Sequence, residues 1–410
     1  MDLKRTDPKV AKIIKQEEKR QKENINLIAS ENYVSKAVRE ATGSVFTNKY
    51  SEGYPYKRYY AGNKIVDEIE TLAIERAKKL FGVGFANVQG LSGSPANQAA
   101  YMALAEPGDT IMGLTLSHGG HLTHGASVNF SGKIFNAIGY NVDPKTELID
   151  FDEVEALAKK HKPKVIVAGF TAYPRIVNWK KFKEVASGVG AHLLADTSHI
   201  TGLIIAGVHP SPVGIADVIM TTTHKTLRGP RGAILMTNDE EIAKKIDKAV
   251  FPGLQGGPHD NTTAAIAVAL KEASGASFRK YGKQIIKNAK ALADSLSKGG
   301  LRLVSGGTDT HLVLVDLGEK GPSGKEVQLA LENVGIIVNK NTVPCETRKP
   351  FVASGIRLGT PAVTTRGMRE KEMEKIGSWI GFVVKNLVDE RKTLSIAKEI
   401  KSLTSKFPVP

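Results

Sequence analysis

The chain has 410 residues, of which 41% are hydrophobic and 24% charged, so it can bury a large core and has the length of two domains. No apolar stretch approaches the ~18 residues of a membrane-spanning helix, and the start, MDLKRTDPKV, lacks the apolar segment of a secretory signal. The one cysteine, Cys345, can form neither an internal disulfide nor a cysteine-rich metal site, which suits a reducing cytoplasm.

The formal net charge of +15 raises the question of a nucleic-acid partner. The lysines, however, are scattered through helical stretches such as residues 10–22 and 242–248, and no basic cluster is interleaved with aromatic residues. We interpret the charge as a lysine-rich, solvated surface and expect neither nucleic-acid nor membrane binding.

The N-terminal part changes character twice. Residues 8–24 predict a charged helix, which the irregular segment NLIASENY follows. The next segment, TNKYSEGYPYKRYYAGN, contains five tyrosines, a proline and glycines. It is too polar for a core strand and too rich in breakers for a helix, so we expect a surface arm. Another helix is predicted over residues 65–80.

From about residue 85, short apolar strands alternate with helical segments such as VNWKKFKEVASGVG. The clearest strands are residues 165–170, 192–196, 218–223 and 233–237. Continuous apolar runs separated by helices are typical of a parallel sheet covered on both faces.

Polar residues lie at the ends of these strands: Thr171 after the first, Asp196 ending the second, and His224 and Lys225 after the third. Ligands of open α/β sheets bind at the carboxyl ends of the strands, so we expect the site there.

After about residue 275 the sequence predicts a long lysine-rich helix, three strands and C-terminal helices, which form a smaller α/β domain. The strands are residues 301–305, 311–316 and 336–339. We therefore expect an N-terminal helix and arm (1–49), a large domain (50–275) and a small domain (276–410).

The segment SGSPANQAAYMALAEPG has the pattern of a helix start. Ser94 suits the N-cap and Pro95 the first helical position. The amides of Gly93 and Ser94 would then face outward at the positive end of the helix, where phosphate binds well. An ordinary capped helix explains the same residues.

In TTTHKTLRGPRGA, Lys225 follows a buried strand. Burial near other cations lowers the pKa of an amine and makes it a Schiff-base nucleophile; a surface charge is the alternative. Arg228 and Arg231 of the same loop suit either phosphate contacts or the protein surface.

Two further charged residues lie in apolar runs. Asp196, in ADTSHITGL, needs a cationic partner. A protonated pyridine nitrogen, an arginine or a helix terminus would each serve. Arg357, in SGIRLGTP, needs a bidentate anion. A substrate carboxylate and a structural Asp or Glu both fit.

Three histidines occur within seven residues of LSHGGHLTHG. A metal site is one interpretation, although no carboxylate flanks the histidines. An imidazole stacked on a flat cofactor ring is the other.

An Asp-ended strand, followed about thirty residues later by a strand ending in His-Lys, has the order seen in fold-type I pyridoxal-phosphate enzymes. Longer strings resemble the serine hydroxymethyltransferase family almost motif for motif, in the same order, from about residue 10 to the C-terminus. They are LIASENY, TNKYSEGYP, KRYY, SGSPAN, HGGHLTHG, TTTHKTLRGPRG, FPGLQGGP, SGGTDTHL, VNKNTVP and SGIRLGTPAVTTRG.

The resemblance implies a large domain with a mainly parallel seven-stranded sheet between helices, a smaller C-terminal α/β domain, and pyridoxal 5′-phosphate held covalently by Lys225. Asp196 would pair with the ring nitrogen, His121 would stack on the ring, and His199 would hydrogen-bond near the ring oxygen. The other implied cofactor contacts are Gly93, Ser94, Thr171 and Arg231, with Tyr50 and Gly257 supplied by the neighbouring subunit. The implied catalytic residues are Lys225, Glu52, His224, Tyr60 and Thr222.

For the substrates, the resemblance implies that Ser30 and Arg357 bind the amino-acid carboxylate. Glu52 and Tyr60 of the neighbouring subunit would act around the serine hydroxyl and the folate. The implied pterin contacts are Leu116, Gly120, Leu122 and Asn341. The implied assembly is a homodimer, or a tetramer, with shared active sites and no metal.

The implied reaction is the reversible transfer of the serine hydroxymethyl carbon to tetrahydrofolate, giving glycine and 5,10-methylenetetrahydrofolate. A tetrahydromethanopterin-type carrier is an alternative co-substrate. A folate-free aldolase acting on threonine-like amino acids is the alternative enzyme, but it would not need the arm with Glu52 in this form. The chain departs from the family pattern at Thr171 (for serine), Ser198 (for alanine) and Gly90-Leu91, and none of these changes removes a catalytic group.

Overall fold

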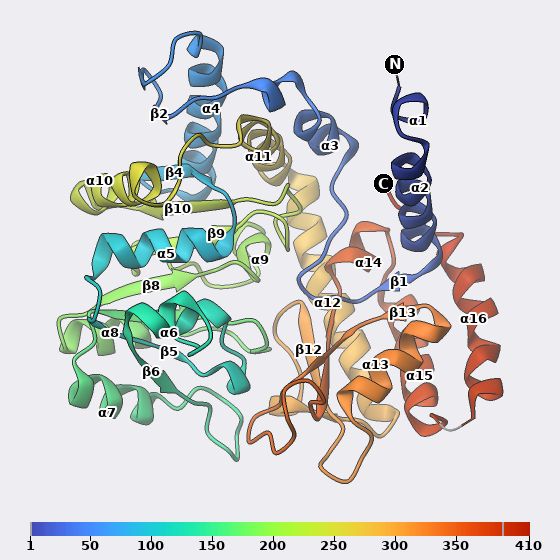
Figure 1. Ribbon diagram of the computed structural model, residues 1–410. Coiled ribbons are helices and arrows are strands. Elements are labelled where there is room, and N and C mark those ends of the chain that lie inside the picture. The colour runs from blue at the N-terminus through green and yellow to red at the C-terminus, as the bar shows by residue number, and fades with distance from the viewer. Residues whose placement is uncertain (1, 388) are drawn as a thin grey trace.

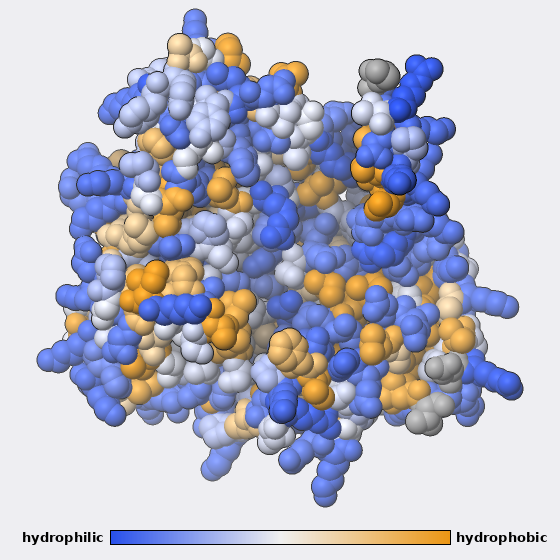
Figure 2. Space-filling model, in the orientation of Figure 1, coloured by the Kyte–Doolittle hydropathy of each residue, from blue (hydrophilic) through white to orange (hydrophobic). Residues whose placement is uncertain are grey.

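The computed structural model describes residues 2–387 and 389–410 and contains two main β-sheets (Figure 1). A seven-stranded sheet is built from residues 85–237 and a four-stranded sheet from residues 302–359. The long helix α12 (Ala276–Lys298) runs between the two (Figure 1). Hydrophilic residues cover most of the face shown in Figure 2. Within the described residues, no helix is long and apolar enough to cross a membrane.

The N-terminal segment forms helices α1 (Leu3–Thr6) and α2 (Pro8–Glu23), and the second confirms the charged helix that the sequence predicts. The Asp7 carboxylate caps α2 by accepting hydrogen bonds from the first amides of the helix. Strand β1 (Ile25–Asn26) then pairs in parallel with β13 (Ile336–Ile337), so the start of the chain packs against its C-terminal part.

The tyrosine-rich arm follows helix α3 (Lys36–Thr42) and the turn η1 (Val45–Asn48), and contains a hairpin of β2 (Gly53–Tyr54) and β3 (Lys57–Arg58). The arm is not wholly on the surface, in contrast to the prediction. Arg58 is held between Asp67 (2.8 Å) and Glu70 (2.6 Å) of helix α4 (Lys64–Phe81), and its side chain is 4% exposed. A buried charge needs such hydrogen-bonded partners, so this network anchors the arm.

The large sheet has the strand order β4-β10-β9-β8-β7-β5-β6. Its strands are β4 (Phe85–Gly90), β5 (Thr110–Leu114), β6 (Asn136–Tyr140), β7 (Val165–Gly169), β8 (His192–Asp196), β9 (Val218–Thr222) and β10 (Ala233–Thr237). Strands β5 to β9 pair in parallel, whereas β10 is antiparallel to β9 and β4. The apolar pattern does not reveal this reversal. Only residues 223–232 join β9 to β10, too few for the crossover that parallel neighbours need.

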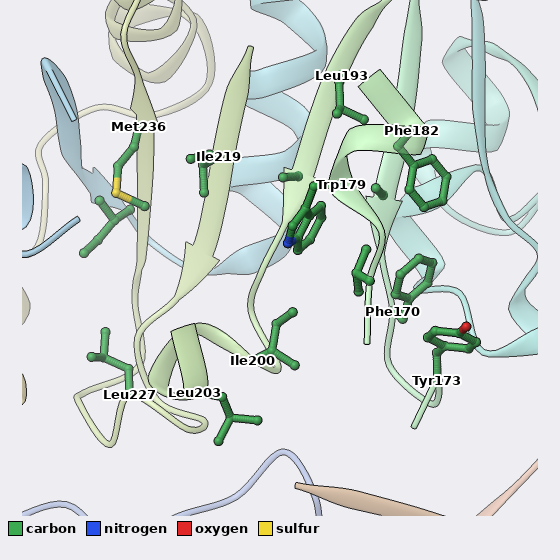
Figure 3. Close-up of a cluster of buried hydrophobic side chains, with 14 of the residues drawn as sticks. Phe170, Tyr173, Trp179, Phe182, Leu193, Ile200, Leu203, Ile219, Leu227 and Met236 are labelled. Atoms are coloured by element: carbon green, nitrogen blue, oxygen red, sulfur yellow. The ribbon is translucent and has the colours of Figure 1, made fainter. Parts of the chain in front are cut away.

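Helices cover both faces of this sheet. They are α5 (Gly93–Leu104), α6 (Phe130–Ile134), α7 (Phe151–His161), α8 (Trp179–Gly188), α9 (Thr201–Ile205), α10 (Glu240–Lys248) and α11 (Asp260–Ala273). Alternate residues of β7 enter different cores: Val165 and Val167 join a cluster with α5 and α10, and Ile166 and Ala168 join one with α7 and α8. Figure 3 shows the second cluster, in which each large side chain contributes about 1.5–3 kcal/mol on burial.

The small sheet has the order β11-β12-β15-β14 and is antiparallel throughout. Its strands are β11 (Arg302–Leu303), β12 (Leu312–Asp316), β14 (Asn339–Asn341) and β15 (Gly355–Gly359), and its helices are α13 (Gly324–Val334), α14 (Pro361–Thr365), α15 (Glu370–Lys385) and α16 (Glu390–Thr404). Two predicted strands are wrong in extent. The first ends early because Ser305 has a left-handed backbone (φ +56°), and residues 336–339 split between β13 and β14.

Arg366 ties the two ends of the chain together. Its buried guanidinium donates hydrogen bonds to the carbonyls of Lys22 (2.9 Å) and Asn24 (2.7 Å) at the end of α2. It also donates to Thr404 (2.9 Å) and Phe407 (2.6 Å) at the end of α16. The last carbonyls of a helix lack partners inside it, so one cation satisfies both helix ends.

Candidate active site

Lys225 lies in the loop that joins β9 to β10 and is 8% exposed. No hydrogen bond or ion pair joins its Nζ to another described residue. Burial lowers the pKa of this amine to about 8; Asp196 opposes that change, and the positive charges of Arg357 and Arg231 add to it. A buried amine with a lowered pKa suits a nucleophile better than a surface charge.

Asp196 ends β8, and its carboxylate accepts four hydrogen bonds. Asn97 Nδ2 (3.0 Å) and His124 Nε2 (3.1 Å) donate to Oδ2. The amide (3.1 Å) and the hydroxyl (2.5 Å) of Ser198 donate to Oδ1. Burial would raise the pKa of this carboxyl, but the hydrogen bond and charge of His124, with the charge of Lys225, hold it well below its usual range. The carboxylate is therefore ionised.

His121 is linked to this carboxylate through Thr123 and Asn97. The amide (3.2 Å) and hydroxyl (2.7 Å) of Thr123 contact His121 Nδ1, and Asn97 donates to both Thr123 Oγ1 (2.8 Å) and Asp196. Because Nδ1 accepts from the amide, the proton of the neutral ring is on Nε2. Burial and the neighbouring His124 lower the pKa of His121 to about 4, so its ring is neutral at neutral pH.

The three histidines of the loop point to different partners. His118 Nδ1 accepts from the amide of Val142 (3.3 Å), whereas His124 pairs with Asp196. In the described part of the chain, no three His, Cys, Asp or Glu residues are grouped so as to hold a metal ion.

His199 follows the same strand as Asp196 and stacks on His311, with ring centroids 5.4 Å apart and planes at 30°. A hydrogen bond of 3.2 Å joins His199 Nδ1 to His311 Nε2. Burial lowers the pKa of both rings, to about 3 for His311. No sequence pattern indicates a role for His311, because its contact with His199 bridges 112 positions of the chain.

Arg357, in β15, donates from Nη1 to the carbonyl of Thr171 (2.7 Å) and from Nε to Asn339 Oδ1 (3.1 Å). Within the residues that the structure describes, no Asp or Glu pairs with it. Burial lowers its pKa to about 10, which leaves the guanidinium charged at neutral pH. The sequence allows two partners for Arg357, a structural Asp or Glu and a substrate carboxylate. Among the described residues the structural partner is absent, which favours the substrate carboxylate.

Ser30 lies near the end of the same strand, because its segment runs beside β15. The amide of Gly359 donates to the carbonyl of Leu27 (2.7 Å). Ser30 also lines a second cavity with His224 and Arg231. Burial, with the charge of Lys225, lowers the pKa of His224 to about 3, and its Nδ1 is buried without a partner.

The start of α5 corrects one prediction. Ser92, not Ser94, is the N-cap: its backbone is extended (φ −167°, ψ 177°), and Gly93 is the first helical residue. Ser94 lies in the first turn instead, because the helix begins one residue before it. The amides of Gly93 and Ser94 remain at the positive end of a helix of 12 residues, so the phosphate interpretation does not depend on the cap.

Lys225, Asp196 and His121 line one cavity together with Gly93, Asn97 and Thr222, whereas Arg357 and Ser94 are not among its described lining residues. Two buried atoms on the wall, Thr222 Oγ1 and Asn97 Oδ1, lack hydrogen-bond partners. A Cβ on Gly93 would come within 2.7 Å of Thr222 Cγ2, so this close approach requires glycine. A buried lysine, an ionised carboxylate, a neutral imidazole and a helix N-terminus fit pyridoxal phosphate.

The four predicted pterin residues are not among the described residues that line this cavity, but Gly120 contacts Thr171, which is. Thr171 donates its hydroxyl to the carbonyl of Gly120 (2.8 Å), where a Cβ would overlap the carbonyl of Leu114. Leu116 and Leu122 are 45% and 43% exposed. Asn341 ends β14, and its side chain donates to a neighbouring carbonyl.

The arm residues form a separate cluster that no hydrogen bond joins to the cavity among the described residues. Tyr50 donates to Glu52 Oε1 (3.2 Å), and its ring meets Tyr60 edge to face at 5.4 Å. Gly257 packs against the Tyr50 ring, where a Cβ would lie 3.3 Å away. Tyr50 and Tyr60 are 56% and 50% exposed, so the cluster faces outward.

Lys225 follows β9 of a mainly parallel seven-stranded sheet, and the ionised Asp196 ends the neighbouring strand β8. This arrangement defines a fold-type I pyridoxal-phosphate enzyme. The family model for serine hydroxymethyltransferase matches residues 3–380. A serine hydroxymethyltransferase of Acidothermus cellulolyticus is 59% identical over 411 residues, covering 99% of this chain and 96% of that protein. The chain belongs to the serine hydroxymethyltransferase family, whose members are transferases that use pyridoxal phosphate with tetrahydrofolate as co-substrate.

Proposed function

We propose that this chain transfers the hydroxymethyl carbon of serine reversibly to tetrahydrofolate, giving glycine and 5,10-methylenetetrahydrofolate. Family membership supports the reaction class. One observation carries the assignment of residues: the buried, unpaired amine of Lys225 and the ionised carboxylate of Asp196 line the same cavity.

Pyridoxal phosphate, when bound, supplies a conjugated ring that accepts the two electrons left on Cα when the Cα–Cβ bond of serine breaks. Lys225 holds the cofactor covalently, and Asp196 keeps a proton on the ring nitrogen because its negative charge stabilises the cation. His121 packs its neutral ring against the cofactor. The amides of Gly93 and Ser94 hold the phosphate.

Arg357 binds the substrate carboxylate, with Ser30 beside it. Its Nη1 and Nε are held by Thr171 and Asn339, which fixes the plane of the guanidinium. A carboxylate held in that plane can turn the substrate so that its scissile bond has the required direction.

Glu52 and Tyr60 of the partner subunit complete the site in a homodimer. Their cluster is exposed in the single chain, and a twofold axis would place each arm over the other subunit's cavity. Glu52 then passes a proton to or from the hydroxymethyl oxygen. The supporting residues are Thr171, His199, Thr222, His224 and Arg231 around the cofactor, Tyr50 and Gly257 at its phosphate, and Leu116, Gly120, Leu122 and Asn341 at the pterin.

The proposal includes a cytoplasmic enzyme and a division of the chain into an N-terminal helix and arm (1–49), a large domain (50–275) and a small domain (276–410). Separate hydrophobic clusters for the two main sheets support the division, although the large-sheet cluster takes in Phe278, Tyr281 and Ile285 from the start of α12. The small-sheet cluster also takes in Ile25 and Leu27 from the N-terminal segment.

The test is the absorption spectrum of the purified protein with pyridoxal phosphate, recorded before and after glycine, tetrahydrofolate and tetrahydromethanopterin. We expect a visible band that changes with glycine and changes again with tetrahydrofolate. A spectrum insensitive to glycine would overturn the proposal, and a second change with tetrahydromethanopterin alone would replace the carrier. Cleavage of threonine-like substrates without any folate-dependent serine turnover would indicate an aldolase.

A further inference from the structure

Ser198 makes two hydrogen bonds that the chemistry described above does not use. It is 5% exposed, and its Oγ lies 2.5 Å from Asp196 Oδ1. The amide of Thr222 donates to the same Oγ (3.1 Å). Because the amide can only donate, the hydroxyl accepts from Thr222, and its own proton is directed to the carboxylate.

The position of Ser198 follows from where β8 ends. Asp196 is the last residue of β8 and pairs with Met220 of β9, and the amide of Thr197 makes the next bond to the Met220 carbonyl (2.8 Å). Thr222 lies beyond that point, where β8 offers no further backbone acceptor. The hydroxyl of Ser198 accepts the hydrogen bond of the Thr222 amide in place of a backbone carbonyl. It thereby extends the β8–β9 hydrogen bonding by one bond and also contacts Asp196.

We propose that Ser198 is a positioning residue of the cofactor site, whose hydroxyl fixes the Asp196 carboxylate and withdraws negative charge from it. This proposal rests on the pairing of Asp196 with the ring nitrogen. Ser198 supplies two of the four hydrogen-bond donors that Asp196 has among the described residues. An O–H donor to a carboxylate makes a short, charge-assisted bond and stabilises the ionised form.

The effect should be measurable at Lys225. Asp196 raises the pKa of the Lys225 amine through its charge. Without the Ser198 hydroxyl, more negative charge stays on Asp196, so the Lys225 nitrogen, with the cofactor attached, should keep its proton to a higher pH.

The experiment is a pH titration of the visible absorbance of the holoenzyme without substrate. In Ser198→Ala we expect the midpoint to rise by about half a pH unit. In Ser198→Cys we expect a smaller rise, because a thiol is a weaker donor. The matched control is Thr197→Val, which removes a buried hydroxyl from the adjacent residue. That hydroxyl contacts Thr201 (2.8 Å) and the Met220 carbonyl (3.2 Å) but not Asp196, so the midpoint should not move.

Thermal unfolding of each variant distinguishes a hydroxyl that positions the Asp196 carboxylate from one that only stabilises the fold. A Ser198→Ala enzyme that unfolds at a lower temperature but titrates like wild type would overturn the proposal, because the hydroxyl would then serve only the strand. If Ser198→Ala does not fold, Ser198→Cys decides, and an unshifted midpoint overturns the proposal. Asp196→Asn tests the assignment of Asp196 to the ring nitrogen. If this variant titrates like wild type, Asp196 does not pair with the ring nitrogen. The error then lies in the proposed function and not in the role of Ser198.

Discussion

The cofactor pocket and the tyrosine-rich arm differ in where their polar side chains lie: those of the pocket are buried, and most of those of the arm face outward. In the pocket the charges are buried, and the Asp196 carboxylate accepts four hydrogen bonds from residues of the same chain. In the arm the buried charge is Arg58, which only anchors, while Glu52 lies with two exposed tyrosines. A pocket satisfied from within can form in one chain. An arm that is rigidly anchored yet faces outward is suited to serve a neighbouring surface.

Among the variants considered, Lys225→Ala should cause the largest loss of activity, and it changes the pocket alone. We expect activity to fall by roughly three orders of magnitude or more, because Lys225 is the nucleophile and no other lysine is among the described residues that line the cavity. Borohydride reduction of the wild type with pyridoxal phosphate, followed by peptide mapping, should label Lys225. A label on any other lysine would contradict the assignment.

Glu52→Gln should break the arm side and spare the pocket. We expect normal cofactor attachment but a fall of roughly 10²–10⁴-fold in folate-dependent serine cleavage, the usual range for losing a proton-transfer group. Glu75→Gln is the control, since this exposed carboxylate pairs with Lys78 on α4 and with no other described residue. Unchanged turnover with serine and tetrahydrofolate would remove Glu52 from the mechanism.

Arg357→Ala should weaken glycine and serine binding by about 1.5–3 kcal/mol, or roughly 10–150-fold, as expected for a charged hydrogen-bonding pair. Pyridoxal-phosphate content should stay near normal, because no cofactor group depends on this guanidinium. Arg302→Ala, which removes an exposed guanidinium from the same sheet, is the control. A glycine titration that matches wild type would make Arg357 structural.

Mixed dimers test whether the arm serves the partner subunit, and their expected activity differs from that of wild type by a factor of about four. Lys225→Ala chains are co-expressed with chains changed at both Tyr50 and Glu52. If the arm serves the partner, one site of each mixed dimer is intact. Random pairing then restores roughly a quarter of wild-type activity. If the arm serves its own chain, every site keeps a lesion. Activity near zero, with mixed dimers verified by mass spectrometry, would therefore rule out sharing.

The sequence predicts best what depends on local pattern. The apolar runs over β7, β8 and β9 and the helix between β7 and β8 are recovered almost to the residue. The direction of β10 is not, because a strand's apolar pattern is the same in either direction and only the connection decides it. The helix cap was misplaced because Ser92 and Ser94 are equally good N-cap residues by type.

The polar partners of the site are the part that the sequence does not reveal. Asn97 and His124 meet Asp196 across 99 and 72 positions, and His311 meets His199 from the small sheet. Their residue types allow many roles, and only the packed sheet brings them within hydrogen-bonding distance. The histidine-rich motif is a usable signal for His124, since it predicts a functional loop, but it does not show that His124 pairs with Asp196.

The pairing of β1 with β13, together with the contacts of Arg366, has a consequence for how the protein is made. Ile25 is synthesised about 300 residues before its strand partner Ile336, or about 15–60 s earlier at 5–20 residues per second. During that time the apolar side chains of Ile25 and Leu27 have no core to enter, while the large sheet can already assemble. During translation the chain therefore carries an exposed apolar segment around Ile25 and Leu27. We expect chaperones to bind this segment until the small sheet is complete.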